Sequence, residues 1–309
     1  SEPRTKPKAC NYALRFAIGD YVTIYDAEDR PDPRQLRQAV QYFRASPPET
    51  VCLQARLNYY NREETLLTRL FAIEYACWFD YMLPALEHLD LPIPLGGTSN
   101  HIALERLRQL GAWDAFNVTE DADLGMRMAR KGQRTRLLPS LTMEEATAHL
   151  IPWLKQRTRW IKGYMQTWLV HMRKPIQLYR ALGWKRFLGF QLFIGGPCLV
   201  FLSTLPLTFL WLASVTSLFP TPSIHPAILW LGNSALLLGI LVHAVSGMFA
   251  VRDLGWKNMH TAILLFPIYW LLHAVASFRA LWQLIVRPHY WNKTSHGHSR
   301  QMHTRDIET

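Results

Sequence analysis

Three acidic side chains, Asp26, Glu28 and Asp29, follow the apolar run of residues 21–25. Carboxylates two residues apart in an extended turn can both reach one hard cation, because such cations prefer oxygen ligands. Mg²⁺ held by one or two acids completes its coordination shell with water and phosphate oxygens, so this site would indicate a nucleotide substrate. The alternative is a solvated acidic turn before a helix, with Asp32 as the helix cap, since acids favour a helix amino terminus.

The triplet Thr119-Glu120-Asp121 combines a hydroxyl with two carboxylates. An ionised carboxylate can act as a general base that takes a proton from a hydroxyl nucleophile. The alternative is the start of a helix, in which Thr119 caps the first turn and the acids offset the helix dipole. The triplet alone leaves both interpretations open.

The segment from Gln156 to Trp160 places an amide, a guanidinium and an indole at helical positions i, i+3 and i+4. These positions share one helix face, so Gln156, Arg159 and Trp160 would lie side by side. A guanidinium pairs with phosphate oxygens, and an indole offers a flat surface on which a sugar ring can stack. The alternative is a membrane-interface helix, in which Trp and Arg are common.

Near the carboxyl end, residues 291–297 contain Lys293, Thr294, His296 and Gly297. A loop with a cation, a hydroxyl, an imidazole and a glycine could close over a diphosphate. The alternative is a basic terminus without a fixed structure.

Most of these candidates belong to a region in which strand and helix signals alternate. Residues 1–145 contain short apolar runs typical of buried strands, amphipathic helical stretches and a loop with a glycine pair. This alternation predicts an α/β sheet domain, in which ligands bind at the carboxyl ends of strands. The predicted strands are residues 21–25 and 50–57, the predicted helices are residues 33–43, 63–82 and 121–130, and the glycine-pair loop is residues 91–100.

The formal net charge is +11, and residues 146–252 contain no Asp or Glu. A basic block of this kind can bind nucleic acid or an anionic membrane. The segments that follow favour a membrane over nucleic acid. Residues 187–213 and 226–251 carry no charge. A bilayer core needs roughly 20 apolar residues in a helix, so each segment is long enough to cross it. We therefore expect two transmembrane helices within residues 187–251, a cytoplasmic basic block and a lipid bilayer, with no nucleic-acid partner.

Two further segments are expected at the membrane surface. Residues 146–186 place aromatic and basic side chains on different helix faces, a pattern typical of interfacial helices. Residues 261–286 are long enough to span a membrane, but Pro267 interrupts the stretch and a basic residue follows in its second half. We expect an interfacial or re-entrant helix rather than a third span, which leaves the tail, residues 287–309, in the cytosol.

Taken in order, these motifs resemble those of the processive family-2 glycosyltransferases, the cellulose synthase and hyaluronan synthase group. The family motifs D-x-D, T-E-D, Q-x-x-R-W and the gating loop F-x-V-T-x-K-G correspond to residues 26–28, 119–121, 156–160 and 291–297. Glu28 replaces the second Asp of the first motif, and His296 replaces the Lys of the gating loop. Residues 96–100 lie where the family has a glycine-containing loop near the acceptor.

The resemblance implies an α/β fold, a Rossmann-like nucleotide-sugar-binding domain of the GT-A type, followed by transmembrane and interfacial helices. It implies that Asp121 is the base that activates the acceptor hydroxyl, giving direct displacement with inversion. The other implied roles fall into three groups. Donor and phosphate binding would be by Asp26, Glu28, Lys8, Thr294 and His296, acceptor binding by Glu120, Gln156, Arg159 and Trp160, and binding of Mg²⁺ or Mn²⁺ by Asp26 and Glu28.

The resemblance also implies that the α/β domain is partial. The family's sheet begins with another strand and an acidic uracil-binding motif. This chain starts near Lys6 to Asn11, which resembles the K-A-x-N segment that follows that motif. We therefore expect an amino-terminally truncated chain, which alone could be inactive.

The expected function is membrane-bound, metal-dependent transfer of a hexose from a UDP-sugar to a growing β-linked polysaccharide. The expected partners are the UDP-sugar, the polysaccharide acceptor, the lipid bilayer and accessory export subunits. The expected location is a bacterial inner membrane, with the catalytic domain in the cytoplasm. Two alternatives remain open, namely transfer of a single sugar to a lipid phosphate carrier and a non-catalytic membrane-anchored binding module.

Overall fold

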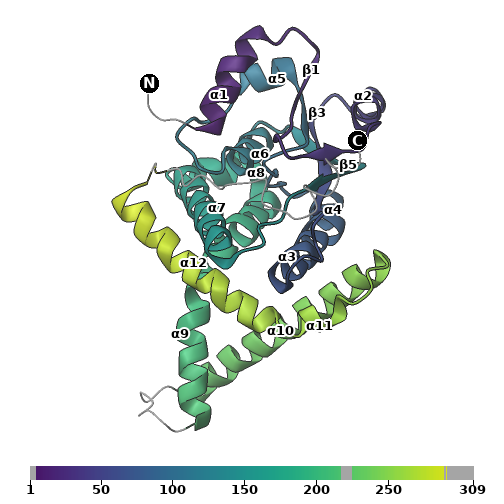
Figure 1. Cartoon of the computed structure of the whole chain (residues 1–309). Helices are drawn as coiled ribbons and strands as arrows, with labels where there is room; N and C mark the ends of the chain where they lie inside the picture. Colours follow the sequence, from purple (N-terminus) through teal and green to yellow (C-terminus); the bar gives the residue numbers. More distant parts are fainter. Residues whose placement is uncertain (1–4, 217–224, 289, 291–309) are drawn as a thin grey trace.

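The computed structural model describes residues 5–216, 225–288 and 290 (Figure 1). Five strands form one mixed sheet in the order β1-β4-β3-β5-β2. β3 and β5 are parallel, and the other neighbouring strands are antiparallel. The strands are β1 (Tyr21–Ile24), β2 (Arg30–Pro31), β3 (Thr50–Tyr59), β4 (Asn100–Ala103) and β5 (Arg134–Glu144).

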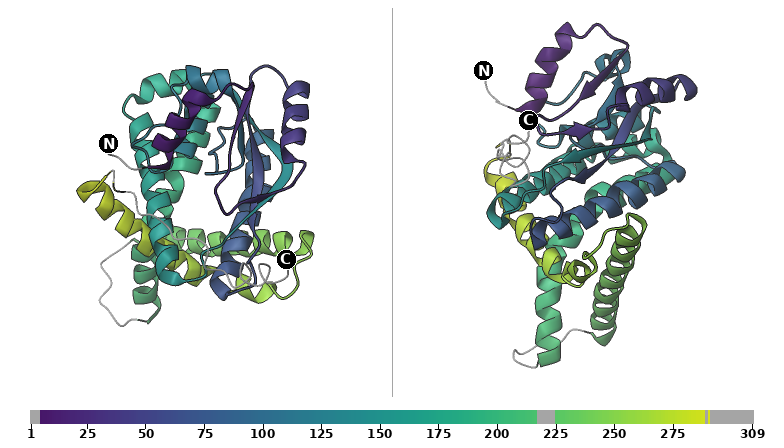
Figure 2. Two further views of the ribbon diagram at one scale, coloured as in Figure 1. Left: turned by 45° about the horizontal axis from the view of Figure 1, so that its top comes forward. Right: turned by 45° about the vertical axis from the view of Figure 1, so that its right-hand side comes forward.

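The central strand β3 is covered by helices on both faces (Figure 2). Because side chains alternate along a strand, Leu53 points to one face and packs with Phe43 of α2, whereas Cys52 points to the other and packs with Leu124 of α6. The predicted strand 50–57 lies within β3. The helices of this part are α1 (Lys6–Ala13), α2 (Gln35–Ala45), α3 (Leu66–Ala76), α4 (Leu83–His88), α5 (Leu104–Gln109) and α6 (Glu120–Arg130), with a 3₁₀ turn at Leu14–Phe16.

The predicted single helix over residues 63–82 is divided into two elements, and a third follows directly. α3 begins only at Leu66, because Thr65 and Thr68 form a reciprocal capping box at its amino terminus. After Ala76 the chain continues through a π-helical turn, Cys77–Met82, into α4. Periodicity alone could not show this change, since all three elements are helical and carry apolar side chains.

Strand β1 forms one edge of the sheet, since among the described residues it pairs only with β4. A hollow of about 330 Å³ lies beside it, between β1 and α2. Tyr21 and Phe43 line this hollow and stack with their ring centroids 4.3 Å apart. The sheet is therefore packed tightly around β3 and more openly at β1.

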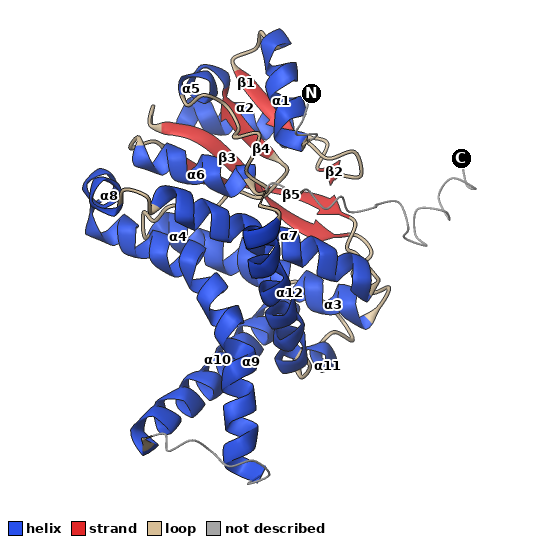
Figure 3. Ribbon diagram, turned by 90° about the vertical axis from the view of Figure 1, so that its left-hand side faces the viewer, coloured by secondary structure: helices blue, strands red, loops and turns tan. Residues whose placement is uncertain are grey.

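The second part of the chain is helical. It consists of α7 (Leu150–His171), α8 (Pro175–Phe190), a π-helical turn (Gln191–Gly195), α9 (Gly196–Thr216), α10 (Pro226–Asp253), α11 (His260–Ile263) and α12 (Phe266–Val286). α7 packs between α6 and α12, and Figure 3 shows it below the sheet. Some of its basic and aromatic side chains, such as Arg157 and Trp153, are buried by protein, whereas Lys155 is exposed, and the interfacial position of α7 stays a prediction.

Two helical stretches are long and apolar enough to cross a membrane, Pro175–Ala213 and Pro226–Asp253. Only 17% of the most apolar part of each is buried, and large side chains such as Trp230 and Leu231 are exposed. Length and composition alone are weak evidence for a membrane, so the two predicted spans stay a prediction. Gly183, with φ +72°, kinks the first stretch before its most apolar part begins.

Pro267 lies next to an interruption of the third apolar stretch, since α11 ends at Ile263 and α12 begins only at Phe266. The proline lies in the first turn of α12, where its missing N–H is not needed and its fixed φ suits a helix start. α12 packs along α7 and α9 (Figure 1). Its contacts with protein leave the predicted interfacial or re-entrant position untested.

Candidate active site

The acidic turn after β1 is closed by Asp29. The Oδ2 atom of Asp29 accepts hydrogen bonds from the backbone N–H of Asp26 (2.8 Å) and from the hydroxyl of Thr98. Burial raises the pKa of Asp29 to about 6, against the opposing effect of these bonds. Its Oδ1 atom is buried without a hydrogen-bond partner among the described residues. Asp29 therefore shapes the turn that presents Asp26 and Glu28.

Lys6, at the start of α1, joins this turn to the glycine-pair loop. Its ammonium forms an ion pair with Asp26 and donates a hydrogen bond to the carbonyl oxygen of Gly97 (2.8 Å). Burial opposes the charge, but Asp26, Glu120 and Asp121 outweigh burial and raise the pKa of Lys6. Lys6 was not among the predicted site residues. Lys8, which was, lies half-buried two residues further along α1.

Asp121 lies against the same loop. A Cβ atom on Gly97 would be only 3.3 Å from its Oδ2 atom, and its Oδ1 atom accepts a hydrogen bond from the N–H of Ala122 (2.7 Å). Burial raises the pKa of Asp121, and burial together with the charge of Asp121 raises the pKa of Glu120. The two predicted motifs, 95 residues apart between Asp26 and Asp121, thus meet across Gly97 and Lys6.

The triplet at the start of α6 rests directly on α7. A Cβ atom on Gly163 would lie 2.3 Å from both the Oγ1 and Cγ2 atoms of Thr119, so only glycine allows this approach. The predicted capping role of the Thr119 side chain is wrong, because its hydroxyl is buried and makes no hydrogen bond to the described residues. The side-chain amide of Gln166 instead accepts a hydrogen bond from the N–H of Val118 (3.4 Å).

The residues of the Q-x-x-R-W segment point to three different neighbours. Gln156 is buried and accepts a hydrogen bond from the hydroxyl of Thr147 (3.2 Å). Burial lowers the pKa of Arg159, and Glu120, Asp121 and Asp26 oppose this shift, which places Arg159 beside the acids. Trp160 is half-buried and contacts the rings of two aromatic side chains on α3, Phe71 and Tyr75, with centroid distances of 6.0 and 6.3 Å.

Glu144 at the end of β5 is a further acid that the sequence did not single out. Burial raises its pKa well above the usual range, and Asp29 and Asp26 add to this shift. The pair of adjacent acids, Glu144 and Glu145, was the available signal, but no strand was predicted before it. Burial and these neighbouring charges thus place Glu144 beside the acidic turn.

The predicted tail residues Thr294 and His296 lie outside the part of the chain that the structure describes. The last described residues fold back onto α7 on the side of the T-E-D triplet. Gln166 donates a hydrogen bond to the carbonyl oxygen of Pro288 (2.8 Å), and Lys162 donates one to that of Tyr290 (2.6 Å). Gln166 therefore contacts both the loop before Asp121 and the start of the tail.

Within residues 5–216, 225–288 and 290, no three His, Cys, Asp or Glu side chains are grouped closely enough to hold a metal ion by themselves. A divalent cation held by one or two carboxylates takes its remaining ligands from water and substrate phosphates. The carboxylates of the turn and the orphaned Oδ1 of Asp29 form an all-oxygen donor set of the kind that Mg²⁺ and Mn²⁺ prefer. The residues present therefore fit such an ion, together with substrate.

Comparison with known proteins gives a family match over most of the chain. The model of the family described as "Glycosyl transferase family group 2" matches residues 21–287. The chain is 28% identical over 180 residues to "Probable glycosyltransferase YdaM" of Bacillus subtilis (strain 168), covering 57% of this chain and 42% of that protein.

Two further relatives have more specific names. The chain is 28% identical over 185 residues to a beta-monoglucosyldiacylglycerol synthase of Synechocystis sp. (strain ATCC 27184 / PCC 6803 / Kazusa), covering 59% of this chain and 37% of that protein. It is 24% identical over 170 residues to glucomannan 4-beta-mannosyltransferase 2 of Arabidopsis thaliana, covering 54% of this chain and 31% of that protein. In all three comparisons, the match spans less than half the length of the relative.

A solved structure shares the fold. It is the mannosyltransferase PcManGT from Pyrobaculum calidifontis in complex with GDP-Man and Mn²⁺, which matches with a TM-score of 0.52 and 18% sequence identity. The match covers 92% of this chain and 68% of that one. Together with the family match, this confirms the predicted GT-A-like α/β fold.

Proposed function

The chain belongs to glycosyl transferase family group 2, and we propose that its site transfers a hexose from a nucleotide sugar to a growing β-linked polysaccharide. The observation that carries the proposal is the meeting of Asp26, Lys6 and Asp121 around Gly97. This arrangement puts a carboxylate suited to proton transfer next to a turn suited to a metal-bound diphosphate.

Asp121 is the proposed base. Its carboxylate takes the proton of the acceptor hydroxyl, whose oxygen forms a bond to the anomeric carbon of the sugar. The bond from that carbon to the diphosphate oxygen breaks at the same time, so the configuration inverts and the nucleoside diphosphate leaves with the electron pair. The raised pKa of Asp121 suits this role, because a base works best when its pKa is close to the working pH.

The other side chains bind and orient. Arg159 and Lys6 carry positive charge next to the acids and would offset the charge of the diphosphate. Glu120, whose pKa is also raised, would bind acceptor hydroxyls, and Trp160 would stack on a sugar ring. Asp26 and Glu28 would hold Mg²⁺ or Mn²⁺, which when bound supplies positive charge that stabilises the leaving diphosphate.

The donor is proposed to be a UDP-sugar, and in the proposal Thr294 and His296 contact its diphosphate. The fold is shared with a mannosyltransferase solved with GDP-Man, so GDP-mannose is the donor to compare first. The two exposed apolar helical stretches support a membrane-bound enzyme with its α/β domain in the cytoplasm, in contact with lipid and with export subunits.

A second candidate function is transfer of one sugar to a lipid acceptor. It is favoured by the exposed apolar α9, which packs against the site-bearing α7, and by the relative named beta-monoglucosyldiacylglycerol synthase. The half-buried Trp160 beside Arg159 favours a sugar acceptor, and so does the relative named for glucomannan.

The proposal is tested by incubating membranes that contain the full-length protein with labelled UDP-glucose, UDP-N-acetylglucosamine and GDP-mannose in separate reactions. The expected product is a polymer that a linkage-specific β-glycosidase degrades, formed only with Mg²⁺ or Mn²⁺. A labelled lipid carrying one sugar would favour the second candidate. No labelled product and no metal-dependent binding of any donor nucleotide would leave the binding-module alternative.

A further inference from the structure

An ion pair between Arg157, which is buried, and Glu74, whose side chain is 31% exposed, joins two helices behind the Q-x-x-R-W segment, and Tyr269 adds a third. The guanidinium of Arg157 on α7 donates two hydrogen bonds to Glu74 on α3, at 2.8 and 2.5 Å. The hydroxyl of Tyr269 on α12 donates to the same carboxylate at 2.6 Å. Burial alone would raise the pKa of Glu74, but Arg157, His273 and Tyr269 lower it to about 2.

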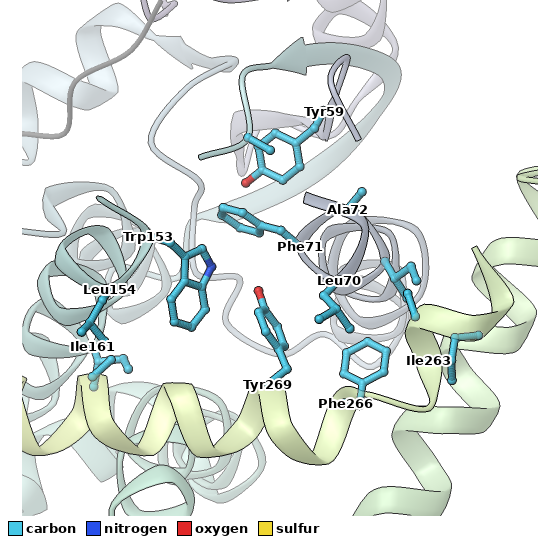
Figure 4. Packing of buried hydrophobic residues seen from close by; sticks show 14 of the residues in the cluster. Tyr59, Leu70, Phe71, Ala72, Trp153, Leu154, Ile161, Ile263, Phe266 and Tyr269 are labelled. Atoms are coloured by element: carbon cyan, nitrogen blue, oxygen red, sulfur yellow. The ribbon is translucent and has the colours of Figure 1, made fainter. Parts of the chain in front are cut away.

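The same guanidinium lies against aromatic rings. Its central carbon is 4.3 Å from the ring centroid of Phe71, 4.7 Å from that of Trp160 and 5.5 Å from that of Trp153. Figure 4 shows Phe71, Trp153 and Tyr269 facing one another from three helices. Cation–π contacts of a desolvated guanidinium are among the stronger contacts that a Trp ring makes.

Arg157 and Arg159 therefore have separate tasks although only one residue lies between them. The charges that act on Arg159 are Glu120, Asp121 and Asp26, whereas those that act on Arg157 are Glu74 and buried tyrosines. Arg157, which is 6% exposed, bonds to Glu74 and Tyr269, neither of which is proposed to bind the donor.

The energy of such an ion pair indicates that it positions the helices rather than stabilising the fold. A buried ion pair contributes little net stability over apolar side chains of similar volume, because removing two charges from water is costly. A two-point guanidinium–carboxylate pair does, however, fix the relative position of the helices that carry it. Here it fixes α7 against α3, and Tyr269 adds α12 to the same arrangement.

We infer that Arg157 is a positioning residue that, held by Glu74 and Tyr269, fixes the indole of Trp160 for binding the terminal sugar of the acceptor. This inference rests on the proposed function. The network extends further through His273, whose ring stacks on Phe201 of α9 at 4.8 Å, so the acceptor platform is tied to an exposed apolar helix as well.

The test uses the full-length protein in membranes and measures two rates with the donor that is turned over. One is donor hydrolysis, in which water replaces the acceptor, and the other is transfer to cellotetraose or mannotetraose. Arg157→Met should raise the acceptor KM tenfold or more while donor KM and hydrolysis stay within twofold. Arg157→Lys, which keeps the charge but not the two-point geometry, should fall between Arg157→Met and the unmodified protein.

The matched control is Arg56→Met, which removes a different ion pair of the α/β domain, with Asp80 at 2.9 Å. It should leave both rates unchanged. A second readout is the ¹⁹F resonance of Trp160 in protein labelled with 5-fluorotryptophan, assigned by its loss in Trp160→Phe. Arg157→Met should shift this resonance, and Arg56→Met should not.

An unchanged acceptor KM in Arg157→Met would overturn the inference, as would an equal loss of hydrolysis and transfer. If Arg157→Met does not fold, Glu74→Gln and Tyr269→Phe take its place. Glu74→Gln removes the charge of the carboxylate, Tyr269→Phe removes the hydroxyl that bonds to Glu74 and Arg157, and both nearly keep the side-chain volume. The same outcomes decide. Absence of both donor hydrolysis and transfer in the unmodified protein would contradict the proposed function instead, and the Trp160 resonance would then still show whether Arg157 positions the indole.

Discussion

The proposed donor side and the proposed acceptor side of the site are built in different ways. Asp26 follows β1, which is paired on one side only among the described residues and borders a hollow of about 330 Å³. Asp121 and Arg159 lie where α6 meets α7, and α7 is buried between helices. The donor side is thus held by one turn and one lysine, and the acceptor side by tightly packed helices. Substitutions should therefore lower activity more strongly on the acceptor side.

Among substitutions that keep the proposed base Asp121, the largest effect is expected at the contact between α6 and α7. Gly163→Ala would place a methyl group 2.3 Å from Thr119, so the start of α6 must move. A displacement of about 1 Å in a catalytic group can cost about 100-fold in rate, and we expect a loss of this order in kcat. Thr119→Ala in the same chain should restore part of it.

The control for this change is Gly232→Ala, a helical glycine whose Cβ atom would meet nothing within 4 Å. It should leave kcat unchanged. Equal kinetics for the two alanine variants would show that the acceptor side is less tightly fixed than the packing indicates.

A smaller loss is expected on the donor side. Asp26→Asn removes the charge that pairs with Lys6 and is proposed to bind the metal. Hydrogen bonds to charged groups contribute about 1.5–3 kcal/mol, so donor kcat/KM should fall about 10- to 100-fold. Asp32→Asn, the same change six residues further on, should have no effect. A rise in the KM of the acceptor, rather than in the KM of the donor, would contradict the division between the two sides.

A substitution in the loop between the two sides should change how kcat depends on pH. The raised pKa of Asp121 means that kcat is lost as the pH falls through that pKa, above the range of an ordinary aspartate. In Gly97→Ala the added methyl group excludes water 3.3 Å from the carboxylate and should move this acidic limb up by about 0.5 pH unit. A pH–rate profile of kcat checks the shift, and a downward shift would contradict it.

The smallest effect concerns stability at the acidic turn. Because folding raises the pKa of Asp29 from 3.8 to about 6, ionising it destabilises the folded state progressively as the pH rises through this interval. Asp29→Asn, which keeps the acceptor oxygen, should gain about 1 kcal/mol relative to the unmodified protein between pH 4 and 6, after allowance for partial exposure. Thermal melting of both proteins checks this, and the difference should be constant above pH 7.

The sequence predicted the fold class and the residues that carry the motifs, because strand–helix alternation and short acidic motifs are local patterns. Contacts between distant segments could not be predicted in this way. No local pattern distinguishes Lys6 from Lys8, since the choice depends on where α1 begins and how it faces the turn. Gly163 looked like an ordinary helical glycine until Thr119 was found against it.

Arg157 shows the same limit within a single helix. A pattern of i, i+3 and i+4 predicts which residues share a face, but not what that face meets. Gln156, Arg159 and Trp160 follow the pattern and contact three different neighbours. Arg157 lies inside the motif and contacts Glu74, 83 residues away.

The central claim is that Asp121 is the base of a site shared with the acidic turn. Its most direct measurement is sugar transfer and nucleotide binding by full-length Asp121→Asn, with Asp114→Asn as the control, since Asp114 is exposed and only caps a nearby turn. The prediction is a loss of transfer of about 10²- to 10⁴-fold with nucleotide affinity within threefold of the unmodified protein. Normal turnover in Asp121→Asn would contradict the claim.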